Sequence, residues 1–96
     1  SFSPTDLVAT ALGTCMITVM GIYAEKNGIL MPNVYSRINK IMTSNPRKIS
    51  KLKIEIIFEG NKLSEKEKQG LKKVALNCPV ANSLHADLQQ EIEFIF

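Results

Sequence analysis

The chain of 96 residues contains two cysteines, and each stands in an apolar helical setting. Cys15 lies in the middle of Leu7–Ala24, a run of eighteen residues without a charged side chain. Cys78 directly precedes a proline, in Asn77-Cys78-Pro79-Val80. Two thiols that meet in one core could support dithiol redox chemistry, with one sulfur attacking an oxidant and the other resolving the product. Buried cysteine is also a common and inert core residue, so both interpretations stand at this point.

Peroxide reduction would use such a pair in two steps. A thiolate attacks the peroxide oxygen and becomes a sulfenic acid, and the second thiol condenses with it to a disulfide. An apolar lining favours organic hydroperoxides over hydrogen peroxide. Burial suppresses the thiolate, so the attacking sulfur needs a cation or hydrogen-bond donors. Cys78 could gain donors from a helix that starts at Pro79, whereas a mid-helix Cys15 would need a positive partner from elsewhere.

The first of the elements that must position these thiols is a long helix. Ser3 can cap it, Pro4 suits the first helical position, and Asp6 completes a capping box with Ser3. We expect the helix to end near Lys26, where Asn27-Gly28 offers a left-handed glycine. Its apolar character extends all the way round, so it must be covered on nearly every side.

The rest of the chain predicts strands and a second helix. Alternating apolar and polar residues favour strands at Val34–Thr43, Leu52–Glu59 and Glu91–Phe96. A capping box at Ser64 begins the second helix, whose apolar stripe continues to Cys78. The order is helix, strand, strand, helix, strand.

This order predicts one α+β domain over residues 1–96. We expect a long buried central helix on a small, mostly antiparallel sheet, with a second helix that carries Cys78. Three strands and one further helix are too little to cover an eighteen-residue apolar helix. A homodimer that buries this helix is the economical solution.

Composition excludes several classes. The net charge is only +3, and the lysines are interleaved with glutamates rather than gathered beside aromatic residues, which argues against nucleic-acid binding. The apolar run falls short of about 20 residues and carries three threonines, so we expect a core helix and not a membrane span. Two cysteines and the lone His85 give no reason to expect a metal site or cofactor. Without a leader sequence, the expected compartment is the reducing cytoplasm.

Two segments resemble a known family. Residues 3–15, SPTDLVATALGTC, resemble the cysteine helix of the OsmC/Ohr family, the osmotically inducible and organic hydroperoxide resistance proteins. Asn77-Cys78-Pro79-Val80, followed by Ser83-Leu84, resembles the second cysteine motif of that family. The last strand, which ends in Phe96, fits the closing strand. The match extends over essentially the whole chain, as the C-terminal two-thirds of the family fold.

The resemblance implies a thiol peroxidase of organic hydroperoxides that acts in oxidative stress defence as an intertwined homodimer. By motif position, Cys15 would be the peroxidatic cysteine and Cys78 the resolving one. Family members take electrons from dithiols or lipoylated proteins and need no metal.

Two features depart from the family pattern. In the family, N-terminal strands that bring an activating arginine precede the cysteine helix, whereas this sequence starts at that helix, so we do not expect that arginine here; Arg37 and Arg47 lie in the wrong segment for its role. Thr5 stands where the hydroperoxidase branches often carry glutamate, and Asp6 follows it, a pattern closer to the OsmC-like branch. Thr5 and Asp6 are therefore candidates for tuning the thiol. The alternatives are a non-catalytic dimer that binds a hydrophobic ligand, and a dithiol redox sensor.

Overall fold

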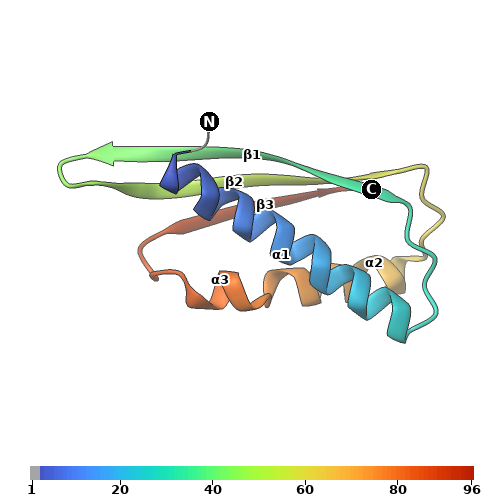
Figure 1. The fold of residues 1–96 in the computed structure, drawn as a ribbon. Helices are drawn as coiled ribbons and strands as arrows, with labels where there is room; N and C mark the ends of the chain where they lie inside the picture. Colours follow the sequence, from blue (N-terminus) through green and yellow to red (C-terminus); the bar gives the residue numbers. More distant parts are fainter. Residues whose placement is uncertain (1–2) are drawn as a thin grey trace.

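The computed structural model describes residues 3–96. Helix α1 (Pro4–Lys26) is followed by strands β1 (Asn33–Ser44) and β2 (Arg47–Glu59). Helices α2 (Glu65–Leu76) and α3 (Pro79–Ser83) come next, and strand β3 (Gln89–Ile95) closes the chain. This order confirms the expected α+β class. In Figure 1 the strands form one layer, and the helices lie together on one side of it.

The ends of α1 are fixed by local signals, as predicted. The Ser3 hydroxyl accepts a hydrogen bond from the Asp6 backbone N–H, and the Asp6 carboxylate accepts one from the Ser3 N–H, each at 3.3 Å. At the other end Gly28 adopts φ +64°, and the Ile29 N–H donates to the Ala24 carbonyl at 2.9 Å. A glycine in the left-handed region costs little because it has no Cβ, so it ends the helix here.

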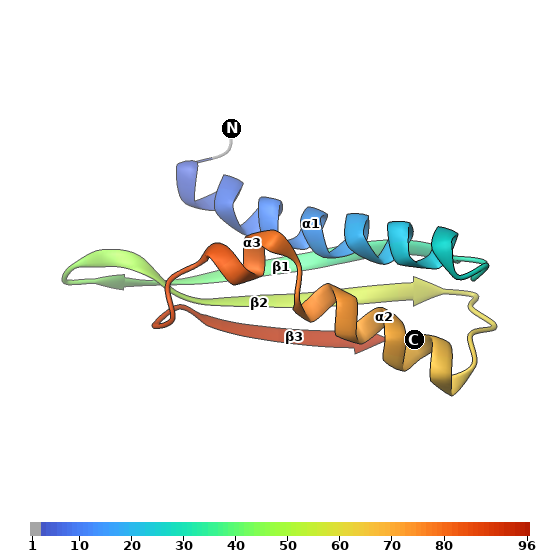
Figure 2. The same ribbon diagram turned by 90° about the horizontal axis from the view of Figure 1, so that it is seen from below.

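The sheet has three strands in the order β1-β2-β3. β1 pairs antiparallel with β2, whereas β2 pairs parallel with β3, so the sheet is mixed. A parallel pair needs a crossover connection, and α2 and α3 provide it. Both elements of the crossover thus lie beside α1 on the same face of the sheet, which Figure 2 shows from below.

The core lies between this face and the helices. From Leu52 to Phe58, the even-numbered residues of β2 point to the helices because side chains alternate along a strand. The fully buried large side chains come from α1, β2, α2 and the α2–α3 junction: Leu12, Met16, Met20, Leu52, Ile54, Ile56, Leu71 and Cys78.

Helix α1 is long and apolar enough to cross a membrane by length and composition alone. Its buried side chains, however, pack with those of β2 and α2 in one core, so it serves as the core helix of a folded domain. The opposite face stays open in the single chain, where Leu7 and Ile22 are 56% and 50% exposed. As predicted, the strands and the other helices of one chain do not cover all of α1.

Candidate redox site

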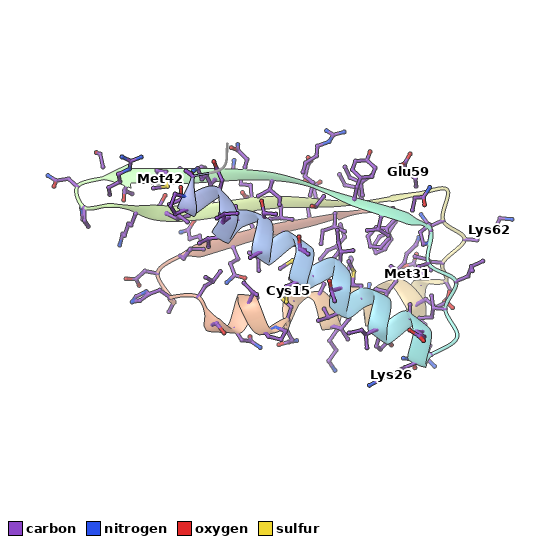
Figure 3. The ribbon with its side chains drawn as sticks, viewed as in Figure 1. Cys15, Lys26, Met31, Met42, Glu59 and Lys62 are labelled. Carbon is purple, nitrogen blue, oxygen red and sulfur yellow. The ribbon has the colours of Figure 1, made fainter. Side chains whose placement is uncertain are left out.

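Cys15 lies near the middle of α1 and is partly exposed. It packs against the edge of the core, on the side of α1 that faces the junction of α2 and α3 (Figure 3). Its i+4 and i+7 neighbours on the helix are Val19 and Ile22, so the thiol stands in an apolar row.

Cys78 has a different setting, because it is the N-cap of α3 and is only 1% exposed. Its sulfur accepts a hydrogen bond from the Ala81 N–H at 3.4 Å, and the Val80 N–H is a second donor. The expectation that Cys78 continues the second helix is wrong in this detail, since α2 ends at Leu76. A residue before proline is disfavoured in the helical region, and Cys78 is extended, with φ −66° and ψ 153°.

The structure places the two cysteines near each other across 63 positions of sequence, because Cys15 packs against the core that contains Cys78. Both are free cysteines. Burial raises the pKa of the Cys78 thiol; the Ala81 N–H lowers it, and the neighbouring Cys15 raises it further. Burial therefore favours the neutral thiol at Cys78, and its neighbour Cys15 is partly exposed.

Thr5 and Asp6 lie at the start of α1, ten and nine residues before Cys15, or about 14–15 Å along the helix axis. Here Lys40 of β1 forms an ion pair with Asp6 at 2.7 Å and a hydrogen bond with the Thr5 hydroxyl. The hydrogen bond from Lys40 holds the pKa of the Asp6 carboxyl below its usual value. The cluster fixes the end of α1 to the sheet, and neither Thr5 nor Asp6 reaches Cys15 directly.

The charge pattern of the sequence does not single out Lys40, because lysines are interleaved with glutamates along the chain. The signal was its position, because Lys40 follows Ser36 and Ile38 on the face of β1 that points to the helices. A lysine at an inward position usually has a partner.

Neither arginine lies beside Cys15. Arg37 is on the face of the sheet away from α1, where it lies 3.9 Å from Glu55. Arg47 begins β2 opposite Ser44, at the tip of the hairpin. An activating cation for Cys15 does not come from these two side chains within one chain.

His85 lies in the exposed loop before β3, and its Nδ1 accepts a hydrogen bond from the Asp87 N–H at 3.0 Å. Within residues 3–96, no group of three His, Cys, Asp or Glu side chains could hold a metal ion.

An open groove of about 340 Å³ lies between α1 and α2, one helical turn beyond the cysteines. Val19, Ile22, Tyr23 and Lys26 of α1 line it, together with Val74 and Asn77 from the α2 side. A second hollow, of about 640 Å³, lies over the outer face of the sheet among charged side chains, away from both thiols. Only the first is placed to hold an apolar molecule next to Cys15.

The chain matches the OsmC-like protein family over residues 1–93. A solved structure from Psychrobacter arcticus 273-4, whose name assigns it to the osmotic stress and detoxification response, is 38% identical, with a TM-score of 0.90. The match covers 98% of this chain and 68% of that one. None of the curated proteins matches the chain.

Two further solved structures share the fold at lower identity. An organic hydroperoxide resistance protein of Legionella pneumophila has a TM-score of 0.76 at 18% identity, covering 100% of this chain and 71% of that one. The organic hydroperoxide resistance protein of Bacillus subtilis has a TM-score of 0.73 at 15% identity, covering 98% and 70%.

Proposed function

Because this chain belongs to the OsmC-like protein family, we propose that it reduces organic hydroperoxides with the Cys15–Cys78 thiol pair, in defence against oxidative stress. The observation that carries this proposal is the proximity of the two thiols, one partly exposed and one buried. The names of the solved relatives from Legionella pneumophila and Bacillus subtilis support the substrate class.

In the first step, the Cys15 thiolate attacks one oxygen of the hydroperoxide. An S–O bond forms and the O–O bond breaks, the alkoxide leaves and takes a proton, and Cys15 becomes a sulfenic acid. Cys15 suits this step because it is partly exposed and lies one helical turn from the apolar groove.

In the second step, the Cys78 sulfur attacks the Cys15 sulfur, an S–S bond forms, and hydroxide leaves as water after taking the Cys78 proton. The Ala81 N–H points at the sulfur as this charge develops. An external dithiol, free or carried on a lipoylated protein, then reduces the disulfide by thiol exchange and is itself oxidised.

The open face of α1 supports a homodimer as the working form. Leu7, Thr14 and Thr18 are exposed along this face, although the helix carries no charge between Leu7 and Ala24. A second subunit would remove this apolar face from water. Sedimentation should give a dimer, and Thr14→Lys should shift the protein toward monomer; a monomeric parent chain would contradict the dimer.

Turnover of cumene hydroperoxide with a dithiol tests the enzyme, in the chain with both cysteines and in Cys15→Ser and Cys78→Ser. We expect Cys15→Ser to lower turnover by about 10²-fold or more. Cys78→Ser should consume about one equivalent and then slow. Equal turnover in all three proteins would contradict the proposal.

A second candidate is a non-catalytic module that binds a hydrophobic ligand. It is favoured by the position of Arg37 and Arg47, since neither lies beside Cys15 to stabilise a thiolate. Ligand binding that both serine variants retain, with no turnover to lose, would support it. Oxidation that stops after one equivalent in the parent chain would instead indicate a redox sensor.

A further inference from the structure

Strand β3 carries one polar side chain on its inward face. Ile92 and Phe94 of this face pack against the core, whereas Gln90, at the first inward position, is an amide. An amide that leaves water needs a hydrogen-bond partner, so glutamine is mostly found at the surface. Gln90 is partly buried, and its Nε2 donates a hydrogen bond to the Ala81 carbonyl of α3 at 3.0 Å.

The Ala81 carbonyl needs this donor because α3 is too short to satisfy it. In a longer helix the carbonyl would accept from an N–H four residues further on. However, α3 ends at Ser83, and Leu84 is extended with φ −83° and ψ 153°. Ala81 is only 8% exposed, so water is a poor substitute. Gln90 therefore satisfies a buried carbonyl and ties α3 to the sheet across nine positions of sequence.

The other backbone group of Ala81 faces the buried thiol. The Ala81 N–H donates to the Cys78 sulfur at 3.4 Å. Burial raises the pKa of the Cys78 thiol, and this N–H acts against the rise. Two hydrogen bonds thus act in series, one from the Gln90 amide to Ala81 and one from Ala81 to the sulfur. The place of the N–H at the sulfur depends on what holds Ala81.

We propose that Gln90 is a positioning residue for the resolving step. Its amide fixes Ala81, and with it the N–H that faces the Cys78 sulfur while that sulfur attacks Cys15. Hydrogen bonds to a charged acceptor are stronger than those to a neutral one, so this N–H contributes most as the thiolate develops. The inference rests on the proposed function for the role of Cys78 and adds a residue of β3 that acts through α3.

The test isolates the attack of Cys78 and needs no hydroperoxide. One equivalent of dithiobis(nitrobenzoate) reacts with the partly exposed Cys15, which gives a mixed disulfide and one nitrothiobenzoate anion. The Cys78 sulfur then attacks the Cys15 sulfur, and an S–S bond forms between them. The bond to the second nitrothiobenzoate breaks, this anion leaves with the electron pair, and the Cys78 proton goes to solvent. The absorbance of the two releases reports Cys15 and then Cys78.

Three variants are compared with the parent chain: Gln90→Met, Gln90→Glu and Gln89→Met. Methionine keeps the length of the side chain without an N–H, and glutamate keeps its shape but replaces the donor with an acceptor. Gln89 is the matched control, because it is the same residue type on the exposed face of β3. Urea denaturation establishes that each variant is folded.

Gln90→Met should slow the second release by about three- to tenfold and leave the first unchanged, a part of what a hydrogen bond to a charged group contributes. The rise of the second release with pH should also move to higher pH, because the thiolate is less stabilised. Cys15 is the titratable group that acts on the pKa of Cys78, and it does not titrate in the mixed disulfide. Gln90→Glu should slow the second release further, and Gln89→Met should match the parent chain.

Two results would overturn the inference. An unchanged second release in Gln90→Met would show that Ala81 stays in place without the amide. Equal slowing of both releases, or failure of both Gln90 variants to fold, would show a general role in the fold and not a role at Cys78.

Turnover of cumene hydroperoxide by the same variants separates this inference from the proposed function. A second release that depends on Gln90, without turnover of hydroperoxide, would keep the positioning role and remove the peroxidase. Turnover with a second release that ignores Gln90 would keep the peroxidase and overturn the positioning role.

Discussion

The two cysteines of this chain show how one core can give two thiols opposite properties. Cys15 lies in mid-helix at the edge of the core and is partly exposed, next to an open groove. Cys78 caps a short helix, is buried, and accepts hydrogen bonds from backbone N–H groups. The difference suits a division of work, because an attacking sulfur must meet a substrate and a resolving sulfur needs only to meet its partner.

The contrast in exposure predicts the largest effect. Maleimide should label Cys15 in the folded chain and label Cys78 more slowly by at least about 10²-fold, since Cys78 reacts only when the fold opens. Peptide mapping by mass spectrometry measures both rates. In urea the two rates should become similar. Comparable labelling in the folded chain would remove the distinction between the two thiols.

The position of Cys15 beside Cys78 depends on how closely α1 packs on the sheet. A Cβ added to Gly13 would lie 2.8 Å from Ile38 Cδ1, so Gly13→Ala should lower the free energy of unfolding by about 1–3 kcal/mol. Gly21 is the matched control on the same helix, because an added Cβ meets nothing within 4 Å. Gly21→Ala should stabilise by about 0.5–1 kcal/mol. Urea denaturation measures both, and equal effects would show that α1 does not need this close approach.

The anchor at the start of α1 predicts a smaller, pH-dependent effect. The pKa of Asp6 is below its ordinary value of 3.8, so its contribution to stability is complete above pH 3.8 and is lost as the pH falls through the lowered pKa. Asp6→Asn should therefore be less stable than the parent chain at neutral pH, and the two should converge in acid. In a Lys40→Met background the same substitution should change little. A difference that persists at low pH would contradict the role of the ion pair.

The ends of the helices could be predicted because their signals are local. Ser3 with Asp6 and Ser64 with Glu67 both form the expected capping boxes. The start of the second hairpin strand is less predictable from the sequence. Alternation predicts that this strand begins at Leu52, whereas β2 begins at Arg47. The residues between them are mostly polar, and pairing with β1 rather than hydrophobic alternation makes them strand.

Other features depend on contacts that the sequence does not encode locally. Alternation predicts that β3 is a strand but not that it lies parallel to β2, because the pattern is the same in either direction. The Cys78-Pro79 motif predicts that a helix starts at Pro79, as the structure shows. The apolar spacing predicts that Cys78 belongs to α2, which is wrong because α2 ends at Leu76. Lys40 is paired with Asp6 across 34 positions, which no local pattern indicates.

The most direct test is to identify the products when the reduced chain reacts once with a hydroperoxide. The fully reduced chain receives one equivalent of cumene hydroperoxide, and mass spectrometry identifies the state of each cysteine while the alcohol is quantified. The account predicts one alcohol per chain and a Cys15–Cys78 disulfide, with Cys15→Ser unreactive. Oxygen added to Cys78 in Cys15→Ser, or two free thiols after the peroxide is consumed, would contradict it.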